Sequence, residues 1–388
     1  MRKIILSLVA IMAYTAVFAQ GIEFGHGTLQ EALAKAKKEN KIVFMDCYTT
    51  WCGPCKYLAK NVFTQKEVGD FFNKNFVNVK MDMESEAGKP LMGKYNVSAF
   101  PTLLWLDSDG NIQHKSLGAS DAEALLLTAK TAADPENSWG ALNKKFEAGE
   151  RSAAFLQNFI LISSQGEFDT KAATEAYYAL KKPEELINAT DLKIITSTVK
   201  STADSKFRFV LKNKAKFYAL SEKAQIDQFI EQIMMEELMK VTREEDKAAI
   251  AAKEAELISL DKEVGVKVIA TAEVNALYRS PERVKFFEAL ANYAIKYDFD
   301  NMEGLNKYAW WIAQAEEEIS KDLMDKAIIM AKRSIELNTN FANIDTYACV
   351  LNKAGRIKEA KVQAKKSIEL ATEEQKKDLW SVKFMEGN

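Results

Sequence analysis

The sequence predicts an α/β domain with a central mixed sheet and helices on both faces, followed by an all-helical region. Over residues 1–133, short apolar runs typical of buried strands alternate with segments whose apolar residues recur at helical spacing. After residues 134–137, which read Asp-Pro-Glu-Asn, only two prolines follow and strand-like alternation disappears. We therefore predict a linker at 134–137 between a domain at 20–133 and helices from 138 onward.

Strands and helices alternate along the first domain. Strands are predicted from short apolar or alternating runs, at residues 41–47, 76–81, 101–106 and 111–117. Helices are predicted from helical spacing, after Thr28, after Pro54, over 66–74 and after Asp121. The turn sequence Asp-Ser-Asp-Gly at 107–110 makes the last two strands a hairpin.

An internal repeat marks the C-terminal part of the chain. The pattern Ala-x-x-x-Ala-x-x-Ser-Ile-Glu-Leu occupies residues 327–337 and recurs at 360–370, an offset of 33 residues. Period and pattern resemble tetratricopeptide repeats, in which small residues let paired helices approach closely. We predict a helical domain at 138–300 and tetratricopeptide-like repeats at 301–388.

The N-terminal residues are typical of a secretory signal peptide. Arg2 and Lys3 precede an uncharged apolar run, and small residues stand before a cleavage point at Gln20. The alternative is an uncleaved anchor helix, but the run of about 15 residues is shorter than the ~20 that a spanning helix needs. We therefore expect removal of residues 1–19, no membrane span in the mature chain, and export to the periplasm, with secretion or surface association as alternatives.

Overall charge narrows the classes of partner. The chain carries 53 Lys and Arg against 55 Asp and Glu, a formal charge of −2. Because no basic excess exists to attract phosphates, the sequence argues against nucleic acid or an acidic membrane surface as a partner.

The chemical signal is the motif Trp-Cys-Gly-Pro-Cys-Lys at residues 51–56. Two thiols at this spacing, where a strand gives way to a helix, can close a small reversible disulfide. Cys52 is expected at the helix N-terminus, where unpaired amides and the helix dipole favour a thiolate, which makes it the nucleophile. Cys55, one turn inside the helix, is suited to resolve the mixed disulfide.

The cysteine pair has two other possible interpretations, a metal site and a structural disulfide. Half a zinc site needs two more ligands, and the candidates are Cys47, Cys349, His26 and His114. None of these forms a second close pair, so we expect no metal. A purely structural disulfide closes almost no loop and restricts the unfolded chain little. Redox chemistry without a cofactor beyond the dithiol is the favoured interpretation.

The motif and its surroundings resemble the thioredoxin superfamily over roughly residues 22–133. Asp46 lies six residues before Cys52, Lys80 lies in the next strand, and Phe-Pro-Thr stands at 100–102. Residues 41–68 look most like the periplasmic C-terminal domain of the membrane thiol–disulfide interchange protein. The resemblance implies a thioredoxin fold.

Roles for further residues follow from this resemblance. It implies that Asp46, paired with Lys80, accepts the proton of Cys55; the alternative is a capping aspartate. It implies a cis Pro101 that presents a backbone edge to an extended client peptide, instead of a plain strand-start proline. Client contacts are implied for the residues around the disulfide, Trp51, Gly53, Pro54, Phe100 and Pro101.

The leading functional hypothesis is an enzyme that exchanges disulfides in client proteins. The Gly-Pro pair between the cysteines is that of reducing thioredoxins. Thioredoxin has a reduction potential of about −270 mV, against about −120 mV for the oxidant DsbA, so a reductase or isomerase is favoured. A membrane-embedded thiol transporter is the expected electron donor. The rival is a helical-repeat scaffold with the redox domain as a regulatory appendage.

The other two cysteines are expected to take no part in the chemistry. Cys47 is interpreted as a buried thiol, the alternative being a third redox cysteine, and Cys349 is interpreted as a packing residue.

Overall fold

The computed structural model describes residues 21–387. The predicted signal peptide, residues 1–19, lies outside this range. Contacts divide the chain into two compact units, with the division between Thr198 and Val199. Along the described chain, no helix is both long and apolar enough to cross a bilayer.

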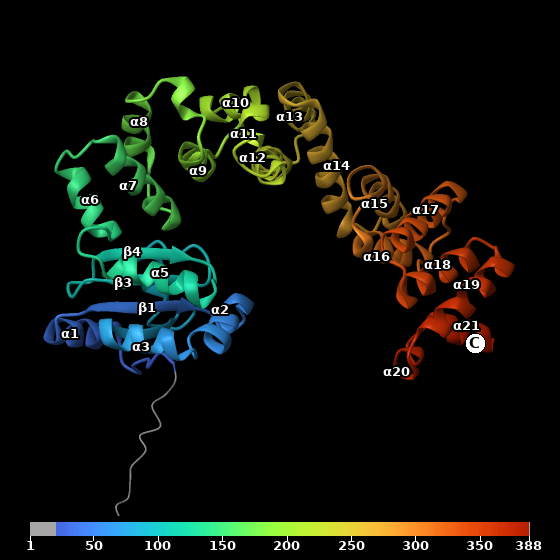
Figure 1. Ribbon diagram of the computed structural model, residues 1–388, viewed down its shortest axis with the longest axis horizontal. Helices are drawn as coiled ribbons and strands as arrows, with labels where there is room; N and C mark the ends of the chain where they lie inside the picture. Colours follow the sequence, from blue (N-terminus) through green and yellow to red (C-terminus); the bar gives the residue numbers. More distant parts are fainter. Residues whose placement is uncertain (1–20, 388) are drawn as a thin grey trace, which may run out of the picture. The chain divides into compact units, whose positions relative to one another are not determined.

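A four-stranded mixed sheet forms the centre of the first unit (Figure 1). Its strands are β1 Ile42–Tyr48, β2 Phe76–Asp82, β3 Thr102–Leu106 and β4 Ile112–Leu117. They lie in the order β2-β1-β3-β4, with β1 parallel to β2 and antiparallel to β3, and with β3 antiparallel to β4. Because β1 is central, its interior residues are buried from both faces.

Helices cover both faces of this sheet, which confirms the predicted fold class. They are α1 Leu29–Glu39, α2 Gly53–Tyr57, α3 Lys66–Asn75, α4 Lys89–Lys94 and α5 Ala122–Ala133. A π-helical turn, Leu58–Val62, continues α2. One apolar core lies between α1 and the sheet and includes Met45, while the other lies under α3 and α5 and includes Phe44. Thr28 caps α1 through a capping box with Glu31, as its position predicts.

Four further α-helices and a 3₁₀ helix, Pro183–Leu186, complete the first unit. The α-helices are α6 Trp139–Glu147, α7 Ala153–Gln165, α8 Lys171–Ala179 and α9 Ala189–Thr198. The predicted linker at 134–137 is a tight turn, in which the Asp134 carboxylate accepts backbone N–H groups of Glu136 and Asn137. Helices α6 and α7, which follow this turn, pack against β4. The packing of the sheet domain therefore continues past residues 134–137, where the composition changes. The predicted domain limits stay predictions.

In its described part the second unit consists of helices joined by turns and loops, without strands, which confirms the all-helical prediction for this part. Its helices are α10 Ser205–Lys212, α11 Lys214–Tyr218, α12 Lys223–Thr242, α13 Lys247–Leu260, α14 Lys262–Tyr278, α15 Arg283–Tyr297, α16 Met302–Ala313, α17 Lys321–Leu337, α18 Phe341–Lys353, α19 Ile357–Leu370, α20 Glu373–Lys376 and α21 Trp380–Glu386. The repeated pattern falls on α17 and α19, and its small residues are buried: Ala327, Ala331, Ser334, Ala360, Ala364 and Ser367. Helix α17 packs against α16 and α19 against α18, an arrangement that fits the tetratricopeptide-like pattern.

Candidate active site

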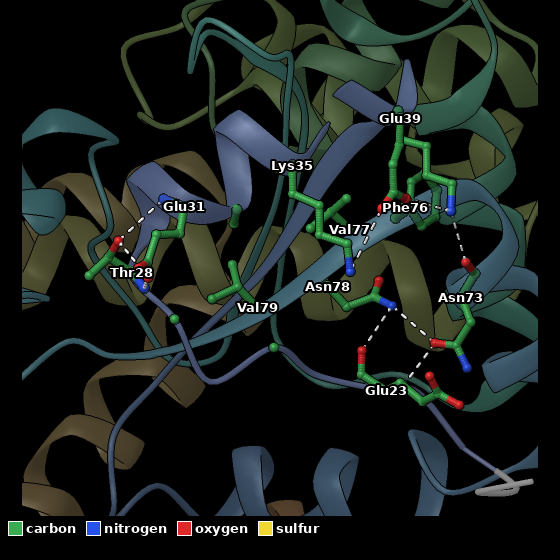
Figure 2. Close-up of a pocket in the computed structure, with 14 residues that line it drawn as sticks. Glu23, Thr28, Glu31, Lys35, Glu39, Asn73, Phe76, Val77, Asn78 and Val79 are labelled. Atoms are coloured by element: carbon green, nitrogen blue, oxygen red, sulfur yellow. Dashed lines mark hydrogen bonds and ion pairs between the residues drawn. The ribbon is translucent and has the colours of Figure 1, made fainter. Parts of the chain in front are cut away.

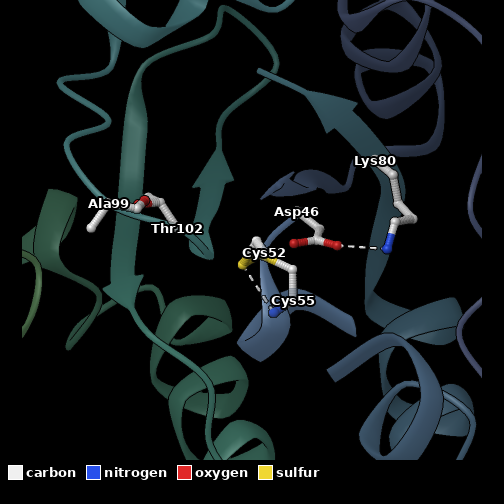
Figure 3. Close-up of a disulfide and its surroundings, with 6 residues drawn as sticks. All are labelled: Asp46, Cys52, Cys55, Lys80, Ala99 and Thr102. Carbon is white, nitrogen blue, oxygen red and sulfur yellow. Dashed lines mark hydrogen bonds and ion pairs between the residues drawn. A yellow bond between two sulfur atoms is a disulfide. The ribbon is translucent and has the colours of Figure 1, made fainter. Parts of the chain in front are cut away.

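Cys52 and Cys55 form a disulfide where β1 gives way to helix α2 (Figure 3). Cys52 has extended backbone angles and is the N-cap of α2, and its Sγ accepts the backbone N–H of Cys55 at 3.1 Å. Pro54 lies in the first turn, where a missing N–H costs no helical hydrogen bond. The sequence Cys-Gly-Pro-Cys therefore starts a helix with a sulfur in the place that a serine or aspartate oxygen usually occupies.

This placement decides which sulfur is the better anion. A sulfur at the N-cap faces unpaired amides and the positive end of the helix dipole, both of which favour a thiolate over a thiol. Cys52 is 3% exposed and Cys55 is 4% exposed, so a disulfide of another protein must be brought close to the surface over the two cysteines before it can react with them. The geometry suits Cys52 to be the attacking sulfur and Cys55 to be the resolving one.

A buried ion pair lies behind the disulfide. Asp46 is 1% exposed on β1, and Lys80 faces it from the paired position on β2, with 2.8 Å between Nζ and Oδ2. Figure 3 shows the Asp46 carboxylate between the disulfide and the Lys80 ammonium. Burial raises the pKa of Asp46, and the charge of Lys80 opposes part of that rise. A carboxyl group with a raised pKa beside a thiol is suited to accept a proton from it.

The Lys80 ammonium connects this carboxylate to the surface. Its Nζ lies 5.1 Å from the ring centroid of Phe24, 4.9 Å from that of Tyr48 and 5.3 Å from that of Phe63. The lysine side chain is 28% exposed and lines an open pocket with Phe24 and Phe63. Three aromatic faces therefore hold the Lys80 ammonium in place beside Asp46.

An exposed apolar rim surrounds the disulfide. The Trp51 side chain is 65% exposed, and its ring meets that of Phe100 edge-on at a centroid distance of 6.1 Å. The peptide bond between Phe100 and Pro101 is cis. Gly53 and Pro54 are exposed beside the buried sulfurs. The structure thus brings every residue predicted for client contact to the surroundings of the disulfide or to the loop that faces Trp51.

One residue of the rim escaped the sequence analysis. The Trp51 indole N–H donates to Glu84 Oε1 at 3.0 Å, which gives the exposed ring a fixed orientation and places a carboxylate at the rim. Glu84 is the second residue after β2 and lies 33 positions from Trp51 along the chain. No local spacing relates the two residues, so only the fold reveals the contact.

The remaining cysteines and histidines lie apart from this chemistry. Cys47 and Cys349 are buried free thiols; burial raises the pKa of Cys47 well above its usual value and that of Cys349 to about 12. His26 is exposed, whereas His114 is buried on β4 and its pKa is lowered to about 4 by burial. Among residues 21–387, no group of three or more His, Cys, Asp and Glu side chains is arranged to hold a metal ion.

A second hollow lies beside α1 and the outer edge of β2 (Figure 2). Three of its charged side chains pair with one another: Glu39 lies 3.8 Å from Lys35 and 3.3 Å from Lys41. Lys41 also donates to the backbone oxygen of Asn73 at 3.2 Å. None of the predicted site residues lines this pocket, and it takes no part in the chemistry proposed below.

The fold and the site together define a thiol–disulfide oxidoreductase domain. A central mixed sheet with helices on both faces carries a Cys-Gly-Pro-Cys disulfide at a helix start, a buried Asp–Lys pair behind it and a cis-proline loop before it. Residues 25–131 match the family model described as Thioredoxin. The chain belongs to the thioredoxin family through this domain.

Three known proteins resemble this chain over 24% to 30% of its length. The thioredoxin of Echinococcus granulosus is 34% identical over 92 residues, which are 24% of this chain and 79% of that protein. The thiol:disulfide interchange protein DsbD of Pseudomonas fluorescens is 31% identical over 101 residues, 25% of this chain and 17% of that protein. A solved structure from Bacteroides thetaiotaomicron, proposed to be a disulphide-isomerase, is 48% identical, covers 30% of this chain and 96% of its own, and has a TM-score of 0.28. The chain spans only 17% to 34% of the length of the first curated relatives that it matches.

Proposed function

We propose that this protein is an exported reductase or isomerase of protein disulfides that acts through the Cys52–Cys55 dithiol, with Cys52 as nucleophile. The observation that carries the proposal is the Cys52 sulfur at the N-cap with the buried Asp46–Lys80 pair behind it. A domain that only binds other proteins has no use for a carboxylate buried beside a disulfide, because such a group destabilises the fold.

The first step is attack on the client. The Cys52 thiolate attacks one sulfur of a client disulfide, so the client S–S bond breaks and a mixed disulfide with Cys52 forms. The other client sulfur leaves as a thiolate and takes a proton from water. Trp51 and the Phe100-Pro101 loop hold the client chain above the sulfurs during this step.

The second step releases the client. Asp46 accepts the proton of the Cys55 thiol, and the Cys55 thiolate attacks the Sγ of Cys52. The Cys52–Cys55 disulfide forms, and the second client sulfur leaves as a thiolate that takes a proton. Two electrons have then passed from the dithiol to the client, with no cofactor beyond the two cysteines.

Regeneration of the dithiol needs an external dithiol donor. We propose a membrane-embedded thiol transporter, which passes two electrons to the Cys52–Cys55 disulfide by the same exchange in reverse. The similarity to an interchange protein supports this proposal. In a host that lacks every such transporter, the pair is expected to accumulate in the oxidised form; a pair that stayed reduced would refute the donor.

Export and the helical part complete the proposal. Residues 1–19 would direct export to the periplasm, and the helical region would bind the client. The second candidate function, a redox-regulated scaffold, is favoured by the length of the helical second unit, which begins at Val199 and has no second redox pair in its described part.

Insulin reduction separates the two candidates. The wild type and a Cys52→Ser variant are compared in the full chain, with Cys349→Ser as the matched control for loss of a thiol. An enzyme loses turnover only in Cys52→Ser, whereas a scaffold shows no cysteine-dependent turnover in any of the three. A Cys55→Ala variant, which cannot resolve the mixed disulfide, then captures the clients for identification by mass spectrometry.

A further inference from the structure

The turn between α7 and α8 lies against the loop that leads into the cis-proline. This turn, residues 165–168, comes from the helical segment that follows the sheet, whereas the loop, residues 96–101, precedes β3. Ser98 Oγ donates a hydrogen bond to Glu167 Oε2 at 3.2 Å. The bond joins residues 69 positions apart and ties the helical segment to the rim of the active site.

A buried lysine holds the other end of the same loop. Lys115 on β4 is 2% exposed, and its Nζ donates to the backbone oxygen of Asn96 at 2.9 Å. The ammonium also lies 5.7 Å from the ring centroid of Phe168, which belongs to the turn. Lysines are almost never fully buried unless they are paired. This one is kept inside by the loop carbonyl on one side and the aromatic face of the turn on the other.

The shape of the turn is itself specified. Phe168 stacks on Trp139 of α6 with ring centroids 3.6 Å apart and planes 10° from parallel. A Cβ at Gly166 would lie 2.5 Å from the Phe168 ring and 3.0 Å from the Lys115 backbone oxygen, so only glycine fits there. Glu167 has a left-handed backbone with φ of 52°, which non-glycine residues adopt rarely. These contacts give the Glu167 carboxylate a defined place from which to hold Ser98.

We propose that the α7–α8 turn is a positioning element of the active site, which fixes the cis-proline loop through Glu167 and Lys115. The loop ends at Phe100-Pro101, where the Phe100 ring meets Trp51 above the disulfide. The proposal deepens the proposed function and rests on it, since the loop matters only if clients bind at this rim. A loosened loop misaligns a protein client and leaves the sulfurs themselves unaltered.

The test separates protein clients from small disulfides. Glu167→Ala and Ser98→Ala remove the bond from either side, Glu167→Gln keeps an acceptor oxygen, and Glu175→Ala is the matched control on the exposed face of α8. Glu167→Ala and Ser98→Ala should each lower kcat/KM for insulin by about three- to tenfold and leave reduction of hydroxyethyl disulfide unchanged. Glu167→Gln and the control should stay near the wild type. Equal losses on both substrates, or none on insulin, would overturn the proposal.

A second measurement does not depend on activity. Hydrogen exchange of the amides in residues 96–101 should be faster in Glu167→Ala than in the wild type and the control, at an unchanged melting temperature. Unchanged exchange in the loop would overturn the positioning role whatever the kinetics show. If the wild type has no cysteine-dependent activity, the proposed function fails, and the exchange of the loop still decides whether the turn holds it.

Discussion

Replacing Asp46 by Asn tests the proton acceptor and the cost of burying it. The carboxylate is 1% exposed, and in the described part of the chain its one close counter-charge is Lys80, which is itself 28% exposed and therefore solvent-screened. An amide of the same shape removes the buried charge, and the Lys80 ammonium keeps its access to water. Removal of one partner of a buried pair is usually destabilising by about 3–5 kcal/mol because the other charge is left buried, but Lys80 stays hydrated here. We therefore expect the variant to be more stable at pH 7, by about 1–3 kcal/mol, the cost of burying a polar group that is only partly compensated.

The pH dependence of this difference has a definite sign. Burial raises the pKa of Asp46, so the folded state binds the proton more tightly than the unfolded chain, whose carboxyl has a pKa of about 3.9. The contribution of Asp46 to the stability of the wild type therefore falls as the pH rises from that value through the raised folded pKa. The amide of the variant cannot titrate, so the advantage of Asp46→Asn should be larger at pH 8 than at pH 4.

The Cys47 thiol can report unfolding of the part of the chain that contains Asp46. It is a free thiol, 0% exposed, next to Asp46, so a thiol reagent labels it only when the sheet opens. Labelling of the oxidised full chain against urea, with the Cys47 peptide quantified by mass spectrometry, reports unfolding of the first unit, which contains both Cys47 and Asp191. The matched control is Asp191→Asn: Asp191 is buried too but bonds Tyr177 and Lys181, so its loss should destabilise the chain.

The same variant tests the chemistry. Without its carboxylate, Asp46→Asn should resolve the mixed disulfide at least about tenfold more slowly. This is less than the roughly 100- to 10,000-fold that a general base typically contributes, because water near Lys80 can accept part of the protons. Decay of a Cys52 mixed disulfide is followed in a single turnover between pH 6 and 8. An unchanged rate over this range would refute the role of Asp46, even if the stability behaved as expected.

Three further predictions follow from the geometry. In the reduced protein at pH 7, Cys52 should be alkylated much faster than Cys55, and equal rates would mean that the nucleophile is wrongly assigned. A chain cut after Thr198 should keep insulin reduction, whereas a cut after Asp134 should lower the melting temperature because it strips α6 and α7 from β4. As the pH falls from about 6.5 to 4, the first unit should lose stability, on the order of 3 kcal/mol, because His114 becomes protonated in the unfolded chain but not in the folded one. In His114→Phe the free energy of unfolding should depend less steeply on pH over this range.

Local chemistry and family resemblance were enough to predict the reacting centre. The Cys-x-x-Cys spacing and the helix start place Cys52 and Cys55, since both depend on neighbours within one turn. The Asp46–Lys80 pair needs the register of two parallel strands, which residue spacing alone does not give. The resemblance supplied that register, and the structure has the two residues at paired positions.

Contacts between distant segments could not be predicted from the sequence. Helical periodicity says that one face of α7 or α8 is buried, but not that the turn between them meets the loop before β3. For the same reason, the contact between Trp51 and Glu84 could not be predicted from the sequence. Helix α4 was not predicted, because its six residues are too few to display a period.

The helical region therefore divides into two parts with different expected roles. Composition changes at 134–137, but the buried contacts of Lys115, Phe168 and Trp139 continue from the sheet into the helices, and the compact unit ends only at Thr198. Loss of residues 138–198 would disturb the rim of the active site itself, and so would impair every protein client, insulin included. Loss of the helices after Thr198 would instead raise KM only for a native client that these helices bind, because a tethered second site acts through effective concentration. The cut after Thr198 therefore tests whether the helical region selects clients. A cut after Asp134 cannot test this, because it would also damage the active site and slow the reduction of every protein client.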